Sequence, residues 1–301
     1  MPADVLDDLA RAASGNFPVL AGVLGLMVGS FLNVVIHRVP REFDREYAEG
    51  CRAFLDEKEP PPGRRWGWIG TLFAPPSHCP KCQARLRARE NIPVVSWLAL
   101  RGRCAHCSAP VSARYPVVEI LTALLSAWTA SALGWGAPGV AALVLVWFLI
   151  ALSFIDADTT LLPNQLTHPL LWIGLLLNLR ATFVPLEEAV LGAAAGYVAL
   201  WSVYRLHKVV TGRDGMGYGD FNLLAAIGAW LGWKMLLPVV LLSSLAGALA
   251  GIALWALRRR GIDVPIPFGP YLAVAGLLAL LHGPILLRIL GEAASSAAGA
   301  R

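Results

Sequence analysis

Apolar residues in this chain gather into long runs, and polar residues lie mostly in the stretches between the runs. Several runs reach the roughly 20 residues that a helix needs to cross the hydrocarbon core of a bilayer. The pattern predicts an all-α polytopic membrane protein with about eight transmembrane helices. The expected spans are residues 17–37, 117–134, 138–155, 163–179, 187–205, 219–233, 236–257 and 266–287.

Composition agrees with a membrane protein. Of the 301 residues, 56% are hydrophobic and only 15% are charged. A soluble domain carries about 25% charged residues, so composition excludes an ordinary soluble protein. Asp4, Asp7 and Asp8 stand where a cleaved signal peptide would carry basic residues. The N-terminus is therefore not expected to be a cleaved signal peptide. Residues 1–16 are expected to form an external N-terminal tail, and residues 291–301 are expected to form a small, polar C-terminal tail.

Residues 38–115 form the longest stretch between predicted spans. They hold 14 of the 25 Lys and Arg residues, against 8 acidic residues. Lys and Arg are enriched in cytoplasmic loops, which places this stretch inside the cell and the N-terminal tail outside. The basic groups at 205–213 and 258–260 then fall on the same inner side. Orientation in a membrane thus explains the net charge of +5. Membrane lipid is an expected partner of the protein, and nucleic acid is not.

Four cysteines in this stretch form two CxxC pairs with 21 residues between them. The spacing is typical of zinc ribbons, and four thiolates complete a closed shell, so a structural zinc ion is expected. Redox thiols or disulfides are the alternative, although disulfides are rare in the cytoplasm. His78 and His106 adjoin the pairs and can replace a thiolate, whereas Cys51 has no partner in the pattern. The expected metal ligands are Cys79, Cys82, Cys104 and Cys107.

Two aspartates lie at the ends of predicted spans. Asp156 belongs to the segment FIDADTTLLPN, and Asp220 belongs to GMGYGD. An acidic side chain at membrane depth costs roughly 2.5–3.5 kcal/mol on insertion scales, so its presence indicates a function. The predicted topology brings both aspartates to the cytoplasmic face. We therefore expect them to form a pair of carboxyl groups suited to acid–base hydrolysis.

The neighbours of the two aspartates affect this interpretation. Asp158 lies two residues after Asp156, on nearly the opposite side of a helix. We therefore expect Asp156 to face the protein and Asp158 to be solvated at the helix end. Gly217 and Gly219 permit unusual dihedrals and a close backbone approach before Asp220. The alternative for Asp220 is that it only caps the helix that follows.

Six motifs occur in order along residues 18–290. They are GSFLNVVIHRVP, the two CxxC pairs, NIPVVSWLALRGRC, ARYPVVEILTA, FIDADTTLLPN and GMGYGD. Together they resemble the motifs of the bacterial type IV prepilin peptidases, also known as leader peptidase/N-methyltransferases. These enzymes are membrane aspartic proteases of the GxGD class.

The resemblance implies a function and its catalytic residues. Catalysis would fall to Asp156, seven residues before Pro163, and to Asp220, which follows Gly217 and Gly219. The implied substrates are type IV prepilins and type II secretion pseudopilins. Their basic leader would be removed after a glycine at the cytoplasmic face of the bacterial inner membrane. The new N-terminal residue would then be methylated with S-adenosylmethionine.

The expected division of the chain follows these motifs. Residues 17–37 form the first transmembrane helix, residues 38–115 a cytoplasmic zinc-binding domain, and residues 116–290 a transmembrane aspartic peptidase domain. Methyl transfer rests on the resemblance alone and is assigned to residues 38–115. No glycine-rich nucleotide motif marks a site for S-adenosylmethionine. Glu119 is one candidate polar group for the methyltransferase site. Alternatively, Glu119 has no role in methyl transfer and is an acidic residue that the dipole at a helix N-terminus stabilises.

Two other functions fit part of the pattern. An ion-coupled transporter or channel would use intramembrane carboxylates, but it leaves the four cysteines unexplained. A membrane scaffold with a zinc-ribbon docking module explains the cysteines and leaves the aspartates without a role. Cleavage of a leader-bearing precursor distinguishes the three functions.

Overall fold

The computed structural model of this chain is helical and divides into two compact units, Met1–Trp135 and Gly136–Arg301. Its described residues contain no β-sheet, only two isolated bridges, His78 with Arg85 and Arg103 with Pro110. The all-α prediction is therefore confirmed for this part of the chain. The residues that the structure describes are 3–55, 67–74, 76–213, 215–257 and 267–299.

The first unit is built on a pair of long helices, α1 (Ala3–Leu55) and α4 (Arg114–Leu133), which pack along each other. Between them in sequence come α2 (Gly67–Phe73), η1 (Ala88–Asn91) and α3 (Val95–Ala99). The pair approaches closely because α1 presents glycines. A methyl group at Gly29 would lie 2.7 Å from the Cα of Glu119. Small residues permit such contacts between membrane helices.

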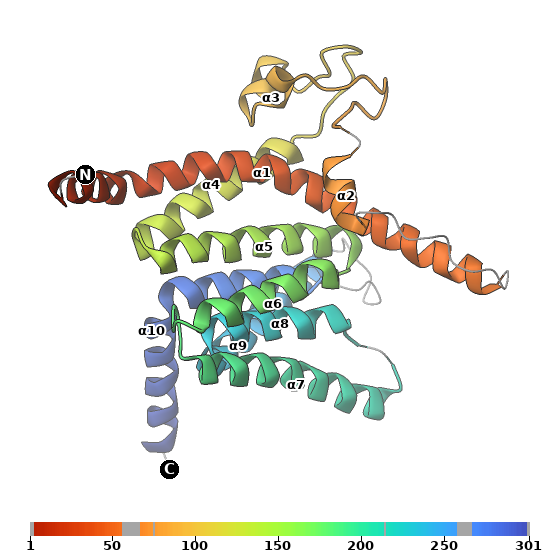
Figure 1. Ribbon diagram of the computed structural model, residues 1–301. Helices are drawn as coiled ribbons and strands as arrows, with labels where there is room; N and C mark the ends of the chain where they lie inside the picture. Colours follow the sequence, from red (N-terminus) through yellow and green to blue (C-terminus); the bar gives the residue numbers. More distant parts are fainter. Residues whose placement is uncertain (1–2, 56–66, 75, 214, 258–266, 300–301) are drawn as a thin grey trace. The chain divides into compact units, whose positions relative to one another are not determined.

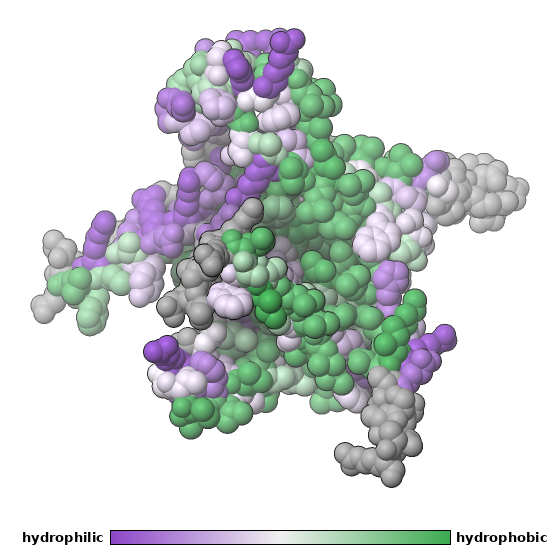
Figure 2. All heavy atoms as spheres, turned by 180° about the vertical axis from the view of Figure 1, so that it is seen from behind, coloured by the Kyte–Doolittle hydropathy of each residue, from purple (hydrophilic) through white to green (hydrophobic). Residues whose placement is uncertain are grey.

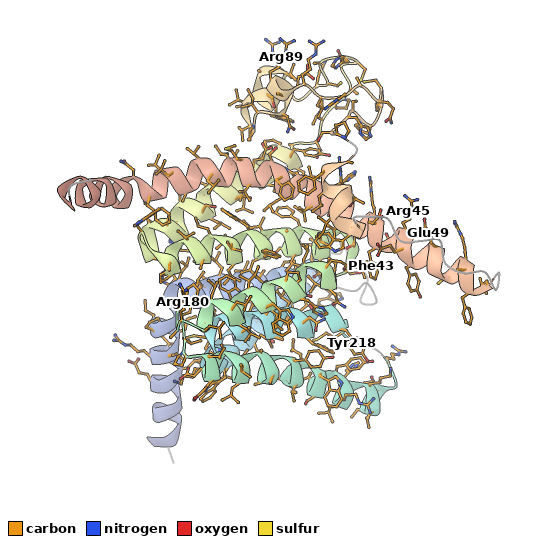
Figure 3. The ribbon with its side chains drawn as sticks, viewed as in Figure 1. Phe43, Arg45, Glu49, Arg89, Arg180 and Tyr218 are labelled. Carbon is orange, nitrogen blue, oxygen red and sulfur yellow. The ribbon has the colours of Figure 1, made fainter. Side chains whose placement is uncertain are left out.

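Helix α1 extends well beyond the span expected at residues 17–37. Residues 38–55, expected in the loop domain, continue the same helix. The extension is rich in charged residues that suit a solvated helix, and Arg45 forms a 2.8 Å ion pair with Glu49 one turn later (Figure 3). Such i,i+4 pairs stabilise helices. The Pro-rich segment at 57–65 lies outside the described residues.

The second unit consists of six α-helices among its described residues and one short 3₁₀ turn. α6, α7 and α8 lie side by side (Figure 1). α8 forms the core, because every residue from Asp220 to Leu231 except Asn222 is buried. The helices are α5 (Ala137–Thr159), α6 (Asn164–Asn178), α7 (Leu186–Thr211), α8 (Tyr218–Leu231), α9 (Leu236–Ala256) and α10 (Gly269–Gly299), with η2 at Trp233–Met235.

Helix α10 bends at His282, whose φ of −129° and ψ of 21° are not helical (Figure 1). Pro284 follows two residues later. Proline removes a backbone donor and its ring clashes with the preceding turn, which is a common cause of sharp kinks.

Helices occur at all eight positions where spans were expected. Six of them are long and apolar enough to cross a bilayer: α1, α4, α5, α7, α9 and α10. The other two, α6 and α8, have only 15 and 14 residues. A multi-pass membrane protein is therefore supported, while the count of eight spans and the orientation stay predictions. The basic group at 258–260 lies outside the described residues.

The molecular surface is that of a protein that faces lipid. Hydrophobic residues cover much of the face shown in Figure 2. On α9, four apolar side chains at helical spacing are 48–62% exposed. An exposed apolar stripe of this size indicates contact with a membrane or a partner. Its members are Leu241, Leu245, Leu249 and Ile252.

The contact between α7 and α8 predicts a measurable effect on stability. Gly192 of α7 faces Gly228 of α8, and a methyl group on either would collide with the backbone carbonyl of the other. We expect Gly192→Ala to destabilise the protein by about 1–3 kcal/mol, since overpacking has this cost. Thermal unfolding in detergent measures it. Gly247→Ala on α9 is the control, because its methyl group would have ordinary contacts at 3.5–3.8 Å. Equal unfolding temperatures for both variants would contradict the prediction.

Candidate active site and metal centre

Asp156 lies near the C-terminal end of α5 and is buried, with 4% of its surface exposed. The backbone amide of Gly269, the first residue of α10, donates a 2.8 Å hydrogen bond to Asp156 Oδ2. A methyl group at position 269 would lie 2.8 Å from the same oxygen. Glycine therefore allows the start of α10 to approach the carboxyl group. Asp158 is exposed on the same helix, as the sequence predicted.

Asp220 lies in the first turn of α8, whose N-cap is Gly217, and is 8% exposed. Its backbone amide donates a 3.3 Å hydrogen bond to the Gly217 carbonyl oxygen. Its Oδ1 is buried and has no hydrogen-bond partner among the described residues. The Asp220 carboxyl group lies close enough to Asp156 for their charges to interact. Both predicted aspartates are therefore buried, and they lie within electrostatic range of each other.

The turn after α5 packs against the start of α8. A methyl group at Gly219 would lie 2.5 Å from the Cβ of Leu162, so the missing side chain allows this contact. Leu162 is buried, and the next residue, Pro163, forms the N-cap of α6. The close approach predicted at Gly219 therefore packs the start of α8 against the residue that precedes Pro163.

A side-chain hydrogen bond joins the same two segments. Asn222 Nδ2 donates to Asn164 Oδ1 at 2.8 Å. Asn222 lies two residues after Asp220, and Asn164 is the first residue of α6. Sequence reasoning missed Asn222 as well as Gly269. Asn222 is the only polar residue between Asp220 and Leu231, which is the signal that could have drawn attention to it.

Aromatic residues connect the start of α8 to α7. Tyr218, labelled in Figure 3, is 57% exposed, and its ring centroid lies 5.5 Å from that of Tyr204 on α7. Phe221 contacts both rings, and Lys208 donates a 3.1 Å hydrogen bond to the Tyr204 hydroxyl group. These contacts fix the first turn of α8, which carries Asp220.

The four cysteines predicted as ligands come together in the first unit. Their sulfur atoms all lie within 4.8 Å of one another. The Sγ atoms of Cys79 and Cys107 are 3.8 Å apart, and those of Cys82 and Cys104 are 4.0 Å apart. Four thiolates around zinc at about 2.3 Å require sulfur separations of roughly 3.8 Å. The donor set therefore fits a structural zinc ion, and its sulfur atoms are too far apart for disulfides.

The two CxxC pairs adopt the same backbone conformation. The Cys79 carbonyl accepts from Gln83 and its amide donates to Ala84, just as Cys104 pairs with Ser108 and Ala109. The residue four after each first cysteine has a left-handed φ, 59° at Gln83 and 56° at Ser108. Backbone hydrogen bonds from Cys82 and Lys81 lower the pKa of the Cys79 thiol to about 6, which favours the thiolate that binds metal.

The histidines beside the pairs have other contacts. The His78 ring lies 3.1 Å from the Pro76 carbonyl oxygen, and the His106 backbone amide donates to Cys104 Sγ at 3.4 Å. The ligand cluster found among the described residues contains the four cysteines alone. Cys51 is exposed and free on α1. The four cysteines are therefore a better set of metal ligands than a set in which His78 or His106 replaces one of them.

Glu119 connects the first unit's loop to its helices. Its Oε2 accepts a 2.7 Å hydrogen bond from the backbone amide of Val94, and Ser30 of α1 bonds to the same carboxyl group. Val94 has a φ of 59°, which is strained for a β-branched residue. Val94 belongs to the segment 91–103, which lies between the two CxxC pairs. Glu119 fixes its start to α4, and Trp97 donates to the Val111 carbonyl oxygen.

Fold and site together define a multi-pass helical membrane protein with a buried pair of carboxyl groups and a separate four-cysteine centre. Two family models match the chain. The bacterial peptidase A24 N-terminal domain matches residues 23–133, and the type IV leader peptidase family matches residues 143–252.

Similar proteins carry the name prepilin leader peptidase/N-methyltransferase. The one from Aeromonas salmonicida (strain A449) is 53% identical, over 94% of this chain and 97% of its own length. The relative from Stutzerimonas stutzeri is 51% identical, over 89% of this chain and 91% of its own length. The relative from Pseudomonas aeruginosa is 49% identical, over 88% of this chain and 90% of its own length. No solved structure gives a significant match. The chain belongs to the type IV leader peptidase family.

Proposed function

We propose that this protein cleaves the basic leader from type IV prepilins and type II secretion pseudopilins, and methylates the new N-terminal residue. The observation that carries the proteolytic half is the pair formed by Asp156 and Asp220 in one buried site. Membership of the leader peptidase family and the names of the relatives support both halves.

The two aspartates are proposed to act through water. Two carboxyl groups at close range share one proton, because both do not readily ionise together. The ionised group takes a proton from water, and the resulting hydroxide bonds to the carbonyl carbon of the scissile peptide. The protonated group donates its proton to the carbonyl oxygen. Collapse of the hydrated intermediate breaks the C–N bond. The leaving amine takes the proton that the first carboxyl group removed from water, and a hydroxyl group of the intermediate returns its proton to the second carboxyl group.

The proposed orientation of the chain in the membrane rests on the distribution of its Lys and Arg residues. The 14 Lys and Arg residues at 38–115 favour a cytoplasmic position for the four-cysteine centre and an external N-terminus. In that orientation the end of α5 and the start of α8 face the cytoplasm in a bacterial inner membrane. The apolar segment of a prepilin would lie in the lipid, and its leader would lie in the cytoplasm.

The four-cysteine centre is proposed to hold zinc for structure. A closed shell of four thiolates leaves no position for a reacting water, so the ion folds the loop and takes no part in peptide hydrolysis. S-adenosylmethionine is the methyl donor that the relatives' name implies. Methyl transfer is assigned to the domain at 38–115, and Glu119 supports it by holding the segment that begins at Val94.

An ion-coupled transporter was the alternative function. The family and its relatives favour the peptidase, and the four-cysteine centre has no role in ion transport. The buried aspartates lie at helix ends and not midway along the spans, which suits a substrate presented from one face.

A cleavage and methylation assay on one purified sample tests the proposal. Incubated with a leader-bearing type IV prepilin, the protein should release the leader, and with labelled S-adenosylmethionine it should transfer label to the mature N-terminus. Mass spectrometry of the product separates the two events. Cleavage should proceed without S-adenosylmethionine. An intact precursor would contradict the peptidase, and a cleaved but unlabelled product would contradict the methyltransferase.

A further inference from the structure

The two aspartates of the proposed active site have different surroundings. Asp156 Oδ2 accepts a buried 2.8 Å hydrogen bond from the Gly269 amide. Asp220 Oδ1 is also buried, and no described group donates to it. A donor to a carboxylate stabilises its ionised form, whereas a buried oxygen without a donor is costly when charged. The surroundings therefore favour ionisation of Asp156 over ionisation of Asp220.

The direction of α10 adds to this difference. Gly269 is the first residue of α10, and the first amides of a helix have no partner within it. The positive end of the helix dipole thus points towards Asp156. Asp220 also lies in the first turn of a helix, its own α8, and interacts with the Gly217 amide. That interaction leaves Oδ1 without a donor.

No other charge reverses the balance among the described residues. The charge that acts on the Asp220 carboxyl group is that of Asp156. Among the described residues, no Lys, Arg or His side chain forms an ion pair with either carboxyl group. Asp158 on α5 is exposed.

We propose that Gly269 is a positioning residue that orients Asp156 and makes it the ionised member of the pair, so that Asp156 is the base and Asp220 the acid. The proposal rests on the proposed peptidase function. Gly269 serves in two ways. Its amide supplies the donor, and its lack of a side chain leaves room for the carboxyl group, since a methyl group would lie 2.8 Å from Oδ2 and 3.1 Å from Cγ.

Gly269→Ala tests the positioning role. We expect kcat for leader cleavage to fall about 10²-fold, as misplacement of a reacting group by about 1 Å can cause, with KM changed less than about 3-fold. The acidic limb of the pH–rate profile should move to higher pH, because the added methyl group displaces the amide that stabilises ionised Asp156. Gly291→Ala on the same helix is the matched control, since nothing lies within 4 Å of its added methyl group.

The thermal unfolding curve of Gly269→Ala in detergent, compared with that of Gly291→Ala, reports whether the second unit of the variant is folded. A folded variant with an unchanged pH profile would overturn the positioning role, even if its rate were lower. If Gly269→Ala does not fold, the assignment of base and acid is tested by Asp156→Asn and Asp220→Asn.

The two asparagine variants should be unequal. An amide at position 220 can still donate to the carbonyl oxygen, whereas an amide at position 156 cannot take a proton from water. We expect Asp220→Asn to keep at least about 10-fold more cleavage than Asp156→Asn, within the range of general acid–base effects. Equal rates, or a faster Asp156→Asn variant, would overturn the assignment. Full cleavage by both variants would instead contradict the proposed peptidase function itself.

Discussion

Replacement of either Asp156 or Asp220 by alanine should lower leader cleavage by on the order of 10³-fold or more, since each loses a group that transfers a proton. Each alanine removes one of the two carboxyl groups that the structure buries together. The effects should not multiply, because the two groups act as a unit, and the double variant should be as slow as either single one. Initial rates on a purified prepilin provide the measurement.

Asp158→Ala is the matched control for this result. Asp158 lies two residues from Asp156 on the same helix, carries the same charge and is exposed. Its loss should leave the rate within about 3-fold of the parent, as expected for an exposed position away from the chemistry. Cleavage at the parent rate by either Asp156→Ala or Asp220→Ala would refute the catalytic assignment. A strong defect in Asp158→Ala would point to a different pair.

Removal of metal from the four-cysteine centre should unfold the segment around it. The purified protein should contain about one zinc ion per chain, bound by Cys79, Cys82, Cys104 and Cys107. Structural zinc contributes on the order of 10 kcal/mol to the folding of small metal sites. Cys104→Ser should therefore abolish zinc binding and expose residues 76–113 to proteolysis. Metal analysis and limited proteolysis measure the two effects.

Cys51→Ser is the control, since Cys51 is a free and exposed cysteine outside the cluster. It should keep its zinc and its resistance to proteolysis. Full zinc content in Cys104→Ser, or a zinc-free parent protein with an intact segment, would contradict a structural metal. Methylation and cleavage of the zinc-free sample show which of the two activities needs the metal.

The sequence predicted the parts of this fold that depend on local patterns. The apolar runs located eight helices, because long uncharged segments favour helices in a bilayer. The two-residue step from Asp156 to Asp158 predicted one buried and one exposed carboxyl group, which the structure confirms. The CxxC spacing predicted four ligands that come together.

Contacts between distant segments were not predictable in this way. Gly269 contacts Asp156 across 113 residues, and nothing in the apolar pattern of α10 identifies its first amide as a donor. The extension of α1 to Leu55 also differs from the prediction, because charged residues that follow an apolar span are typical of a loop as well as of a solvated helix. Ion pairs such as Arg45 with Glu49 stabilise that extension as a helix.

Helix α8 is too short to cross a bilayer core by itself. With 14 residues at 1.5 Å each, α8 measures about 21 Å, less than the roughly 30 Å of a bilayer core. Its buried residues contact protein on all sides, so its depth is set by α6 and α7 and not by lipid. Longer helices tilt when bilayer thickness changes. Asp220 should instead keep its place beside Asp156, and cleavage should tolerate lipids of different chain length.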